Sequence, residues 1–311
     1  MAPDPLLPPR RLVARLRGAS PGPTLIVIGG LHGNEPSGNA AMQRVAESLE
    51  RARTPMRGDV TMVAGNLGAL VRGVRFVDHD LNRGWSRERL AALRAAAPET
   101  LDAEDREQLA LAEALEAALG AARGPAFLLD LHATSAAGIP FALCRDSPEA
   151  RRFAGAFPLT VVLGLIEALS GTLAGYLGDR CTAVVVEGGQ NSAPATIRNH
   201  EAVLWLALAA AGIVVEPDVP SIEARRETLT RTRGDLPPVL EVHHRHAIAA
   251  EDRFRMEPGF ANIQRVDGNQ LLAHDRAGEI RAPEPGFVLM PLYQTMGDDG
   301  FFLGREAGGG A

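Results

Sequence analysis

Strand-length apolar runs alternate with helical segments over the first two thirds of the chain. The runs occupy residues 24–30, 59–66, 126–135 and 181–189. Between them, apolar residues recur at helical spacing after Pro36 and through residues 102–122. Short runs that are apolar almost throughout are typical of strands buried on both faces of a parallel sheet. The pattern therefore predicts an α/β fold in which helices flank a mainly parallel or mixed sheet.

A different pattern begins near residue 215. Short apolar runs are separated there by Pro-Gly and Asp-Gly turns, which is typical of a small all-β domain. We therefore expect an α/β domain over residues 1–218 and a C-terminal β domain over residues 219–311. The segment 221–238 is charged and has few large apolar residues, so it is the expected connection.

The charge balance argues against several classes of protein. The net charge is −6 and the chain has no long basic cluster, so we expect no binding to nucleic acid. No stretch approaches the roughly 18 uncharged apolar residues that a membrane helix needs. The first 18 residues place arginines after a short apolar patch, unlike a secretory signal, and we expect a cytoplasmic protein.

All 32 basic residues are arginine. The absence of lysine excludes Schiff-base catalysis, covalent attachment of pyridoxal phosphate, biotin or lipoate, and the P-loop lysine. Cys144 and Cys181 lie in apolar stretches, and we predict two buried free thiols rather than a disulfide.

Candidate metal ligands lie where predicted strands end. His32 and Glu35 share the loop after the first strand, and His132 lies near the end of another. Two imidazoles and one carboxylate leave the fourth position of a tetrahedral zinc ion open to water or substrate, which is typical of a catalytic site. Each histidine taken alone is more often a surface or hydrogen-bonded core residue, so the prediction depends on all three meeting at one sheet edge.

Two further groups of polar residues could take part in catalysis. Glu187 ends a buried apolar strand, where a raised pKa would suit a general base near a metal; the alternative is an acid that caps the strand toward solvent. The segment RFVDHDLNRGW at 75–85 contains two arginines, which could bind a carboxylate or an oxyanion. The alternative for this segment is a salt-bridged loop.

Five motifs occur together in a recognisable order. They are GGLHGNEPSG at 29–38, GN at 65–66, RFVDHDLNRGW at 75–85, DLHATS at 130–135 and VVVEGG at 184–189. Their order and approximate spacing resemble the succinylglutamate desuccinylase and aspartoacylase family, whose members are related to zinc carboxypeptidases. The resemblance covers roughly residues 24–191 and, more weakly, the β domain. It implies a zinc-carboxypeptidase-like fold.

The resemblance implies a role for each residue of the metal site. It identifies His32, Glu35 and His132 as the ligands of one zinc ion per chain. Glu187 matches the glutamate that activates the zinc-bound water. Asp130 is expected to orient a zinc-bound histidine.

The resemblance also implies residues that contact the substrate. Arg75 matches the arginine that stabilises the tetrahedral intermediate, and Asn82 and Arg83 match the pair that binds a substrate carboxylate. Tyr293 is the candidate for a further substrate contact from the β domain, although an ordinary packing role is an equal alternative.

These roles predict a zinc-dependent hydrolase that cleaves the amide bond of a small N-acyl amino acid or a related acylated carboxylate. One alternative is a zinc carboxypeptidase or esterase acting on small peptides or esters. Another is a non-catalytic ligand-binding homologue, which would be expected to have lost Glu187 or a zinc ligand. The expected partner is a small carboxylate substrate rather than nucleic acid or a membrane, and the β domain leaves room for assembly into a homo-oligomer.

Overall fold

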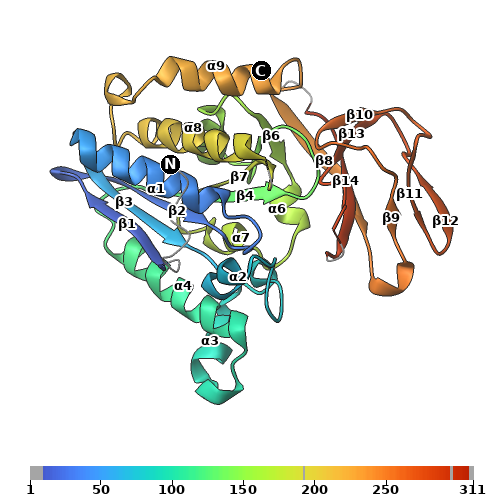
Figure 1. Cartoon of the computed structure of the whole chain (residues 1–311), viewed down its shortest axis with the longest axis horizontal. Coiled ribbons are helices and arrows are strands. Elements are labelled where there is room, and N and C mark those ends of the chain that lie inside the picture. The colour runs from blue at the N-terminus through green and yellow to red at the C-terminus, as the bar shows by residue number, and fades with distance from the viewer. Residues whose placement is uncertain (1–9, 192, 295–296, 308–311) are drawn as a thin grey trace.

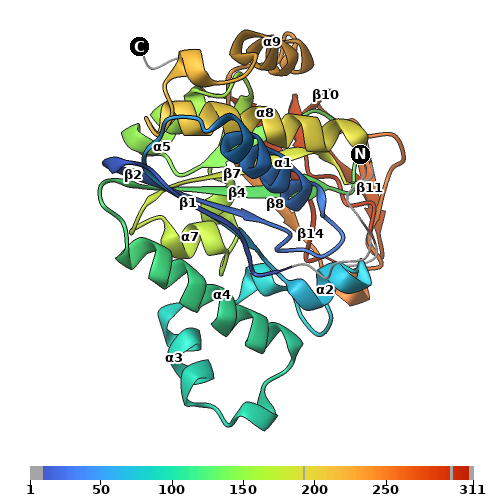
Figure 2. The same ribbon diagram turned by 60° about the vertical axis from the view of Figure 1, so that its left-hand side comes forward.

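The centre of the molecule is one eleven-stranded mixed sheet with helices on both faces (Figures 1 and 2). This computed structural model describes residues 10–191, 193–294 and 297–307. The strands of the sheet run in the order β1-β3-β2-β4-β7-β5-β6-β8-β14-β13-β10. Their bounds are β1 (Leu12–Arg17), β2 (Ser20–Gly29), β3 (Arg57–Ala64), β4 (Ala126–Thr134), β5 (Phe141–Cys144), β6 (Thr160–Leu163), β7 (Thr182–Gln190), β8 (Val239–Ala247), β10 (Gln264–Val266), β13 (Gly286–Leu289) and β14 (Asp299–Glu306).

The four predicted apolar runs form four neighbouring parallel strands of this sheet. Neighbouring strands β3, β2, β4 and β7 all run in the same direction. Their carboxyl ends therefore lie at one edge, where α/β sheets place their ligands. The sheet is mixed because β1 pairs antiparallel with β3, and β5 pairs antiparallel with β7. The predicted α/β fold is confirmed.

Helices cover both faces of the parallel strands. Their bounds are α1 (Ser37–Ala52), α2 (Leu67–Arg72), α3 (Arg87–Ala95), α4 (Ala103–Gly120), α5 (Pro148–Gly155), α6 (Leu165–Ala168), α7 (Leu173–Leu177), α8 (Pro194–Ala210) and α9 (Ile222–Arg233), with single 3-10 turns η1 (Leu81–Arg83), η2 (Pro98–Thr100), η3 (Glu216–Asp218) and η4 (Ala250–Asp252). In both ribbon views α1, α8 and α9 lie above the sheet, whereas α3 and α4 lie below it.

The two faces of β2 contribute to different hydrophobic cores. Leu25 and Val27 pack in the core that includes α1, α5 and α8. Ile26 and Ile28, which alternate with them, pack in the core that includes α4 and α7. Because successive side chains of a strand point to opposite faces, a strand covered on both sides must be apolar at every position.

The C-terminal strands continue the central sheet and also form a small second one. Strand β8 pairs parallel with β6, and β14, β13 and β10 extend the sheet antiparallel. The second sheet has the order β12-β11-β9, with bounds Gly278–Arg281, Leu271–Asp275 and Arg255–Met256. The predicted C-terminal β structure is confirmed, and the boundary at residue 218 stays a prediction. The charged segment 221–238 contains helix α9. Leu229 is the buried residue of this helix, so its sequence has no clear apolar pattern that would have predicted it.

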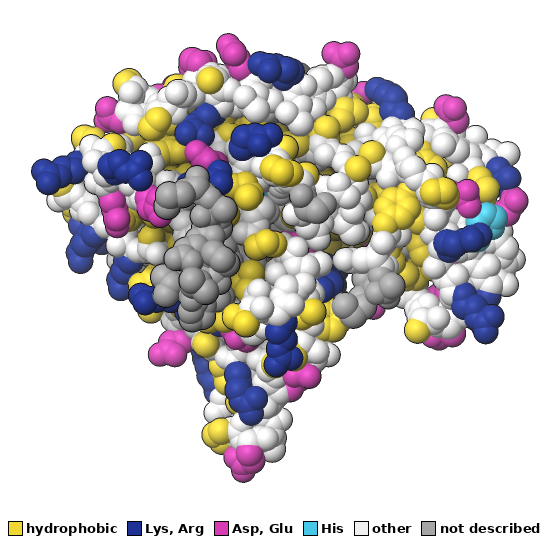
Figure 3. Space-filling model, viewed as in Figure 1, with side chains coloured by type: hydrophobic (Ala, Val, Ile, Leu, Met, Phe, Trp, Pro, Cys, Tyr) yellow, Lys and Arg dark blue, Asp and Glu magenta, His cyan; other side chains and the backbone are white. Residues whose placement is uncertain are grey.

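Several smaller expectations can be compared with the described residues. Cys144 is buried, Cys181 is half-buried, and both are free thiols. Within the described ranges no helix combines the length and apolar character needed to cross a membrane. Acidic and basic side chains interleave over the face seen in Figure 3. Of the first 18 residues, which were compared with a secretory signal, residues 1–9 lie outside the described residues.

Candidate active site

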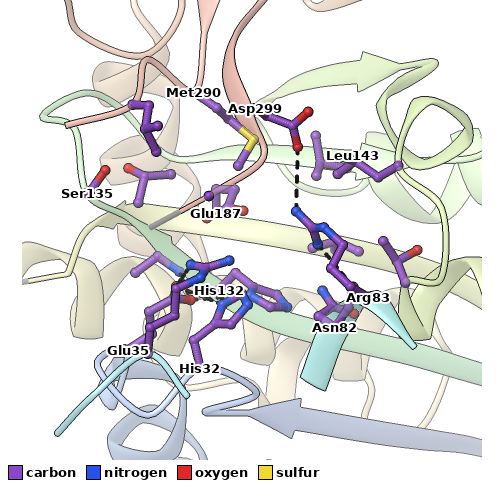
Figure 4. A pocket seen from close by; sticks show the side chains of 18 of the residues that line it. His32, Glu35, Asn82, Arg83, His132, Ser135, Leu143, Glu187, Met290 and Asp299 are labelled. Carbon is purple, nitrogen blue, oxygen red and sulfur yellow. Dashed lines mark hydrogen bonds and ion pairs between the residues drawn. The ribbon is translucent and has the colours of Figure 1, made fainter. Parts of the chain in front are cut away.

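Three predicted metal ligands meet at the carboxyl edge of the parallel strands. The Nδ1 atom of His32 lies 2.9 Å from Oε1 of Glu35, and the Nδ1 atom of His132 lies 3.2 Å from Oε2 of Glu35. All three residues are buried. One ligand atom from each lies within 4.8 Å of the others, so the group could hold a metal ion. Figure 4 shows the three side chains clustered on one side of the pocket.

Each imidazole faces a second carboxylate through its other nitrogen. The Nε2 atom of His32 lies 3.3 Å from Oδ1 of Asp80, and the Nε2 atom of His132 lies 3.2 Å from Oδ2 of Asp130. Histidines that bind metals usually have such an outer carboxylate, which fixes the orientation and tautomer of the ring. Asp130 lies beside His132 but forms no hydrogen bond to it among the described residues, so its orienting role stays a prediction. The contact of Asp80 with His32 was not predicted, although Asp80 is the last acid of the 75–85 motif.

Glu35 keeps its charge in a buried position. Burial by itself would raise the pKa of Glu35, but the charge of His32 and hydrogen bonds from both imidazoles outweigh that effect and lower the pKa. The backbone N–H of Ala133 also donates to Oε2 of Glu35, at 3.0 Å. The loop after β2 is thereby tied to the end of β4.

Glu187 lies next to this cluster on the adjacent strand. Its Cα atom is in register with that of His132 in the parallel pair β4 and β7. Glu187 is 5% exposed, and its Oε2 atom has no hydrogen-bond partner among the described residues. Burial raises the pKa of Glu187 to about 7, although the charge of His132 opposes the shift. A carboxylate with such a pKa can both accept and release a proton near neutral pH.

Arg75 faces the cluster between two carboxylates. Its Nη2 and Nε atoms contact Oδ2 of Asp80 at 2.9 and 3.3 Å, and its Nη1 atom lies 3.5 Å from Oε1 of Glu35. These contacts hold the guanidinium beside the candidate metal ligands.

Asn82 and Arg83 lie on the other side of the same pocket. The Asp80 side chain accepts from the backbone N–H of Asn82 at 2.8 Å and so caps the turn η1. The Oδ1 atom of Asn82 accepts from the backbone N–H of Leu173. The Nη2 atom of Arg83 lies 3.7 Å from Oδ2 of Asp299, which comes from the C-terminal strand β14 (Figure 4).

Glu104 anchors the loop that carries these residues. Its carboxylate accepts hydrogen bonds from the backbone N–H groups of Val77, Asp78 and His79, and from the side chain of Asn66. Burial would raise the pKa of Glu104, but these hydrogen bonds outweigh it and lower the pKa. The GN motif therefore supports the 75–85 loop through Glu104, a contact that the sequence did not predict.

A second cluster of metal-type ligands overlaps this anchor. Ligand atoms of His79, Asp102 and Glu104 also lie within 4.8 Å of one another. The Glu104 oxygens already accept the loop's backbone N–H groups, and Asp102 caps helix α4. These hydrogen bonds explain why Glu104 and Asp102 lie close together without a metal ion.

His200 supports the metal ligands from behind. Its Nε2 atom hydrogen-bonds to the backbone oxygen of His132 at 2.9 Å. A Cβ atom at Gly188 would lie 2.2 Å from the His200 ring, which explains the glycine after Glu187. Burial lowers the pKa of His200 to about 4, so this ring is neutral near pH 7.

Tyr293 lies outside this cluster. Its hydroxyl accepts from the backbone N–H of Phe260 and donates to the backbone oxygen of Glu257. Leu292 and Gln294 line the pocket, but Tyr293 is absent from its described lining. Its role in substrate binding stays a prediction that the geometry does not support.

Comparison with known proteins relates this geometry to a family. The family model for the succinylglutamate desuccinylase/aspartoacylase catalytic domain matches residues 21–196, which include all five motifs. The chain belongs to this family. The motifs therefore predicted its family correctly.

Curated relatives of this family member match over a limited segment. Succinylglutamate desuccinylase from Burkholderia pseudomallei (strain 1710b) is 31% identical over 130 residues, which are 40% of this chain and 36% of that protein. The enzyme from Burkholderia mallei is 32% identical over 111 residues, 35% of this chain and 30% of that protein. The match thus spans only about a third of these relatives.

Solved structures share the family fold over nearly the whole chain. A succinylglutamate desuccinylase/aspartoacylase from Rhodobacter sphaeroides has a TM-score of 0.69 at 18% identity, and the match covers 96% of this chain and 88% of that one. The product-bound ectoine utilization protein EutE (DoeB) from Ruegeria pomeroyi has a TM-score of 0.66 at 21% identity, covering 94% and 87%. At these identities the likeness shows the fold.

Replacing Asp80 should weaken metal binding by this family member. Asp80→Asn removes the charge that faces Nε2 of His32 and Arg75, so we expect zinc affinity to fall about 10-fold to 100-fold. Competition with a chromophoric zinc chelator measures the affinity. Asp78→Asn, an exposed change two residues away, is the matched control and should leave affinity within about twofold. Equal affinity in the two variants would contradict an orienting role for Asp80.

His200 should make the protein less stable in acid. Its pKa is about 4 in the fold and 6.5 ordinarily, so the unfolded chain binds the proton more readily. Stability is therefore retained above pH 6.5 and lost as the pH falls toward 4, by up to about 3 kcal/mol. Urea unfolding with a chelator present should show a shallower loss in His200→Gln. Parallel pH profiles in the two proteins would show that His200 does not titrate this way.

Proposed function

We propose that this protein is a zinc-dependent deacylase that hydrolyses the amide bond of a small N-acyl amino acid or a related acylated carboxylate. The observation that carries the proposal is the position of Glu187. It is a buried carboxylate with a pKa of about 7, next to a cluster of two histidines and a glutamate. Family membership supports the hydrolase class.

The residues of the cluster suit zinc. His32, Glu35 and His132 supply two imidazole nitrogens and one carboxylate oxygen, which is a donor set of catalytic zinc sites. The Nδ1 atoms of both rings converge on the Glu35 carboxylate, while both Nε2 atoms face aspartates. When bound, zinc would polarise a carbonyl group and lower the pKa of a water molecule toward about 7.

Glu187 is placed to move the proton that amide hydrolysis requires. Its free Oε2 atom can accept a proton from the attacking water. The same carboxyl group can then donate that proton to the nitrogen of the leaving amine as the C–N bond breaks. Because the pKa is near neutral pH, neither transfer leaves Glu187 in an unfavourable protonation state.

The arginines divide two tasks between them. Arg75 is fixed beside Glu35 by Asp80, so its guanidinium can offset the negative charge that develops on the carbonyl oxygen. Arg83 and Asn82, on the other side of the pocket, are the groups that would bind a carboxylate of the substrate.

The other functions considered from the sequence have less support. A non-catalytic homologue has no need for a buried carboxylate of raised pKa beside the intact ligand set. Cleavage of esters or small peptides would use the same residues, and no described contact favours those bonds over an N-acyl amide.

Replacing Glu187 should separate catalysis from metal binding. Glu187→Gln keeps the size of the side chain but cannot accept the proton, so amine release from N-acyl amino acids should fall about 100-fold to 10,000-fold. Zinc content, measured by elemental analysis, should stay at one ion per chain.

The matched control is Glu47→Gln on the exposed surface of helix α1, which should leave both quantities unchanged. A Glu187→Gln protein that retains near-normal turnover would remove the general-base role. A variant that loses zinc would show instead that Glu187 supports the metal site.

A further inference from the structure

We propose that the amino acid released by this enzyme has an uncharged, apolar side chain and a single carboxylate. The inference rests on the deacylase function proposed above and specifies its substrate class. Three features of the pocket carry it: an apolar wall, the place of the carboxylate-binding pair beside that wall, and the pairing of the pocket's arginines.

The apolar wall is formed by apolar lining residues from several elements of the fold. It consists of six residues, which are Leu143, Ile166, Leu169, Ala174, Val185 and Phe302. All of them belong to or pack against one hydrophobic core, which lies between the parallel strands and the C-terminal strands. An apolar group that enters the pocket would therefore replace water against packed carbon atoms.

The carboxylate-binding pair adjoins this wall. The Oδ1 atom of Asn82 accepts from the backbone N–H of Leu173 at 2.8 Å, and the next residue, Ala174, belongs to the wall. Figure 4 shows Leu143 on the same side of the pocket as Arg83. An amino acid whose carboxylate contacts Arg83 would thus direct its side chain to the apolar wall. This assigns the wall to the leaving amino acid rather than to the acyl group.

Once Arg83 binds the first carboxylate, the described lining residues offer no further arginine that is free to bind a second one. Arg75 and Arg83 are the arginines of that lining. Arg75 is already paired with Asp80 and Glu35, and Arg83 lies 3.7 Å from Asp299.

The acidic residues of the pocket offer no partner for a second carboxylate. Asp298 and Asp299 line it together with the buried Glu187. Asp299 also pairs with Arg245, at 2.5 Å. A carboxylate that reached the apolar wall would be desolvated without a cationic partner among the described lining residues, which is unfavourable. A dicarboxylic amino acid should therefore be a poor substrate.

The test compares three substrates of similar length and different charge. N-acetyl-L-methionine, N-acetyl-L-glutamate and N-acetyl-L-ornithine are supplied to the zinc-loaded protein, and kcat/KM is measured by amine release. The inference predicts that methionine exceeds each of the others by about 100-fold. A second series varies the acyl group on methionine from acetyl to butyryl to succinyl, and its effect should be smaller than that of the amino acid.

A variant of the wall gives a second, independent readout. Leu169 is half-buried at the end of helix α6, so it tolerates replacement better than the core members of the wall. Leu169→Arg places a cation there and should raise kcat/KM for N-acetyl-L-glutamate at least tenfold while lowering that for N-acetyl-L-methionine. Leu169→Gln, which is polar but uncharged, is the matched control and should not gain activity on glutamate.

The outcomes separate this inference from the function on which it rests. Preference for glutamate or ornithine would overturn the inference and leave the deacylase function standing. A preference that follows the acyl series would overturn the assignment of the wall to the amino acid. No release from any of these N-acyl amino acids by folded, zinc-loaded protein would overturn the deacylase function, and the inference with it.

Discussion

Glu35 is a carboxylate held inside the protein, and the arrangement of the site depends on how its charge is balanced. A buried charge is costly unless cations and hydrogen-bond donors surround it. Here His32, His132, Arg75 and the backbone N–H of Ala133 all face the two Glu35 oxygens. These partners come from the loop after β2, the end of β4 and the 75–85 loop. The carboxylate therefore brings three separate segments to one point.

Residues of opposite charge also surround the partners of Glu35. Asp80 contacts both His32 and Arg75, and it also caps the turn that presents Asn82 and Arg83. The loop itself is held by Glu104, whose carboxylate takes up the loop's backbone N–H groups. The 75–85 loop thus links the candidate metal ligands, which Asp80 and Arg75 contact, to Asn82 and Arg83. The C-terminal strands join this arrangement where Arg83 meets Asp299 of β14.

Much of the fold could be predicted from local patterns, and the metal cluster could be predicted from those patterns together with the family resemblance. Strands buried on both faces are apolar throughout, and parallel strands end at a common edge. These two facts place His132 and Glu187 at the same edge of the sheet, whereas the direct pairing of their strands is seen only in the structure. Strands β5 and β6 are only four residues long, too short for an apolar run to distinguish them from helix or loop.

Contacts between segments far apart in the chain could not be predicted in this way. Glu104 resembled any acid in the first turn of a charged helix, yet it is fully buried against the 75–85 loop. His200 lies in a helix and reaches the back of His132 because Gly188 leaves space for its ring. Tyr293 was a candidate for substrate binding, but its hydroxyl contacts backbone groups of Glu257 and Phe260 instead. Each depends on side-chain packing across segments, which has no periodic signal in the sequence.

The most direct test of the central claim is the location of zinc in crystals of the zinc-loaded protein, determined by anomalous diffraction at the zinc edge. The account predicts one peak bound by Nδ1 of His32, Nδ1 of His132 and a carboxylate oxygen of Glu35, at distances of about 2.0–2.2 Å. A peak at the cluster of His79, Asp102 and Glu104 without one at Glu35 would contradict it.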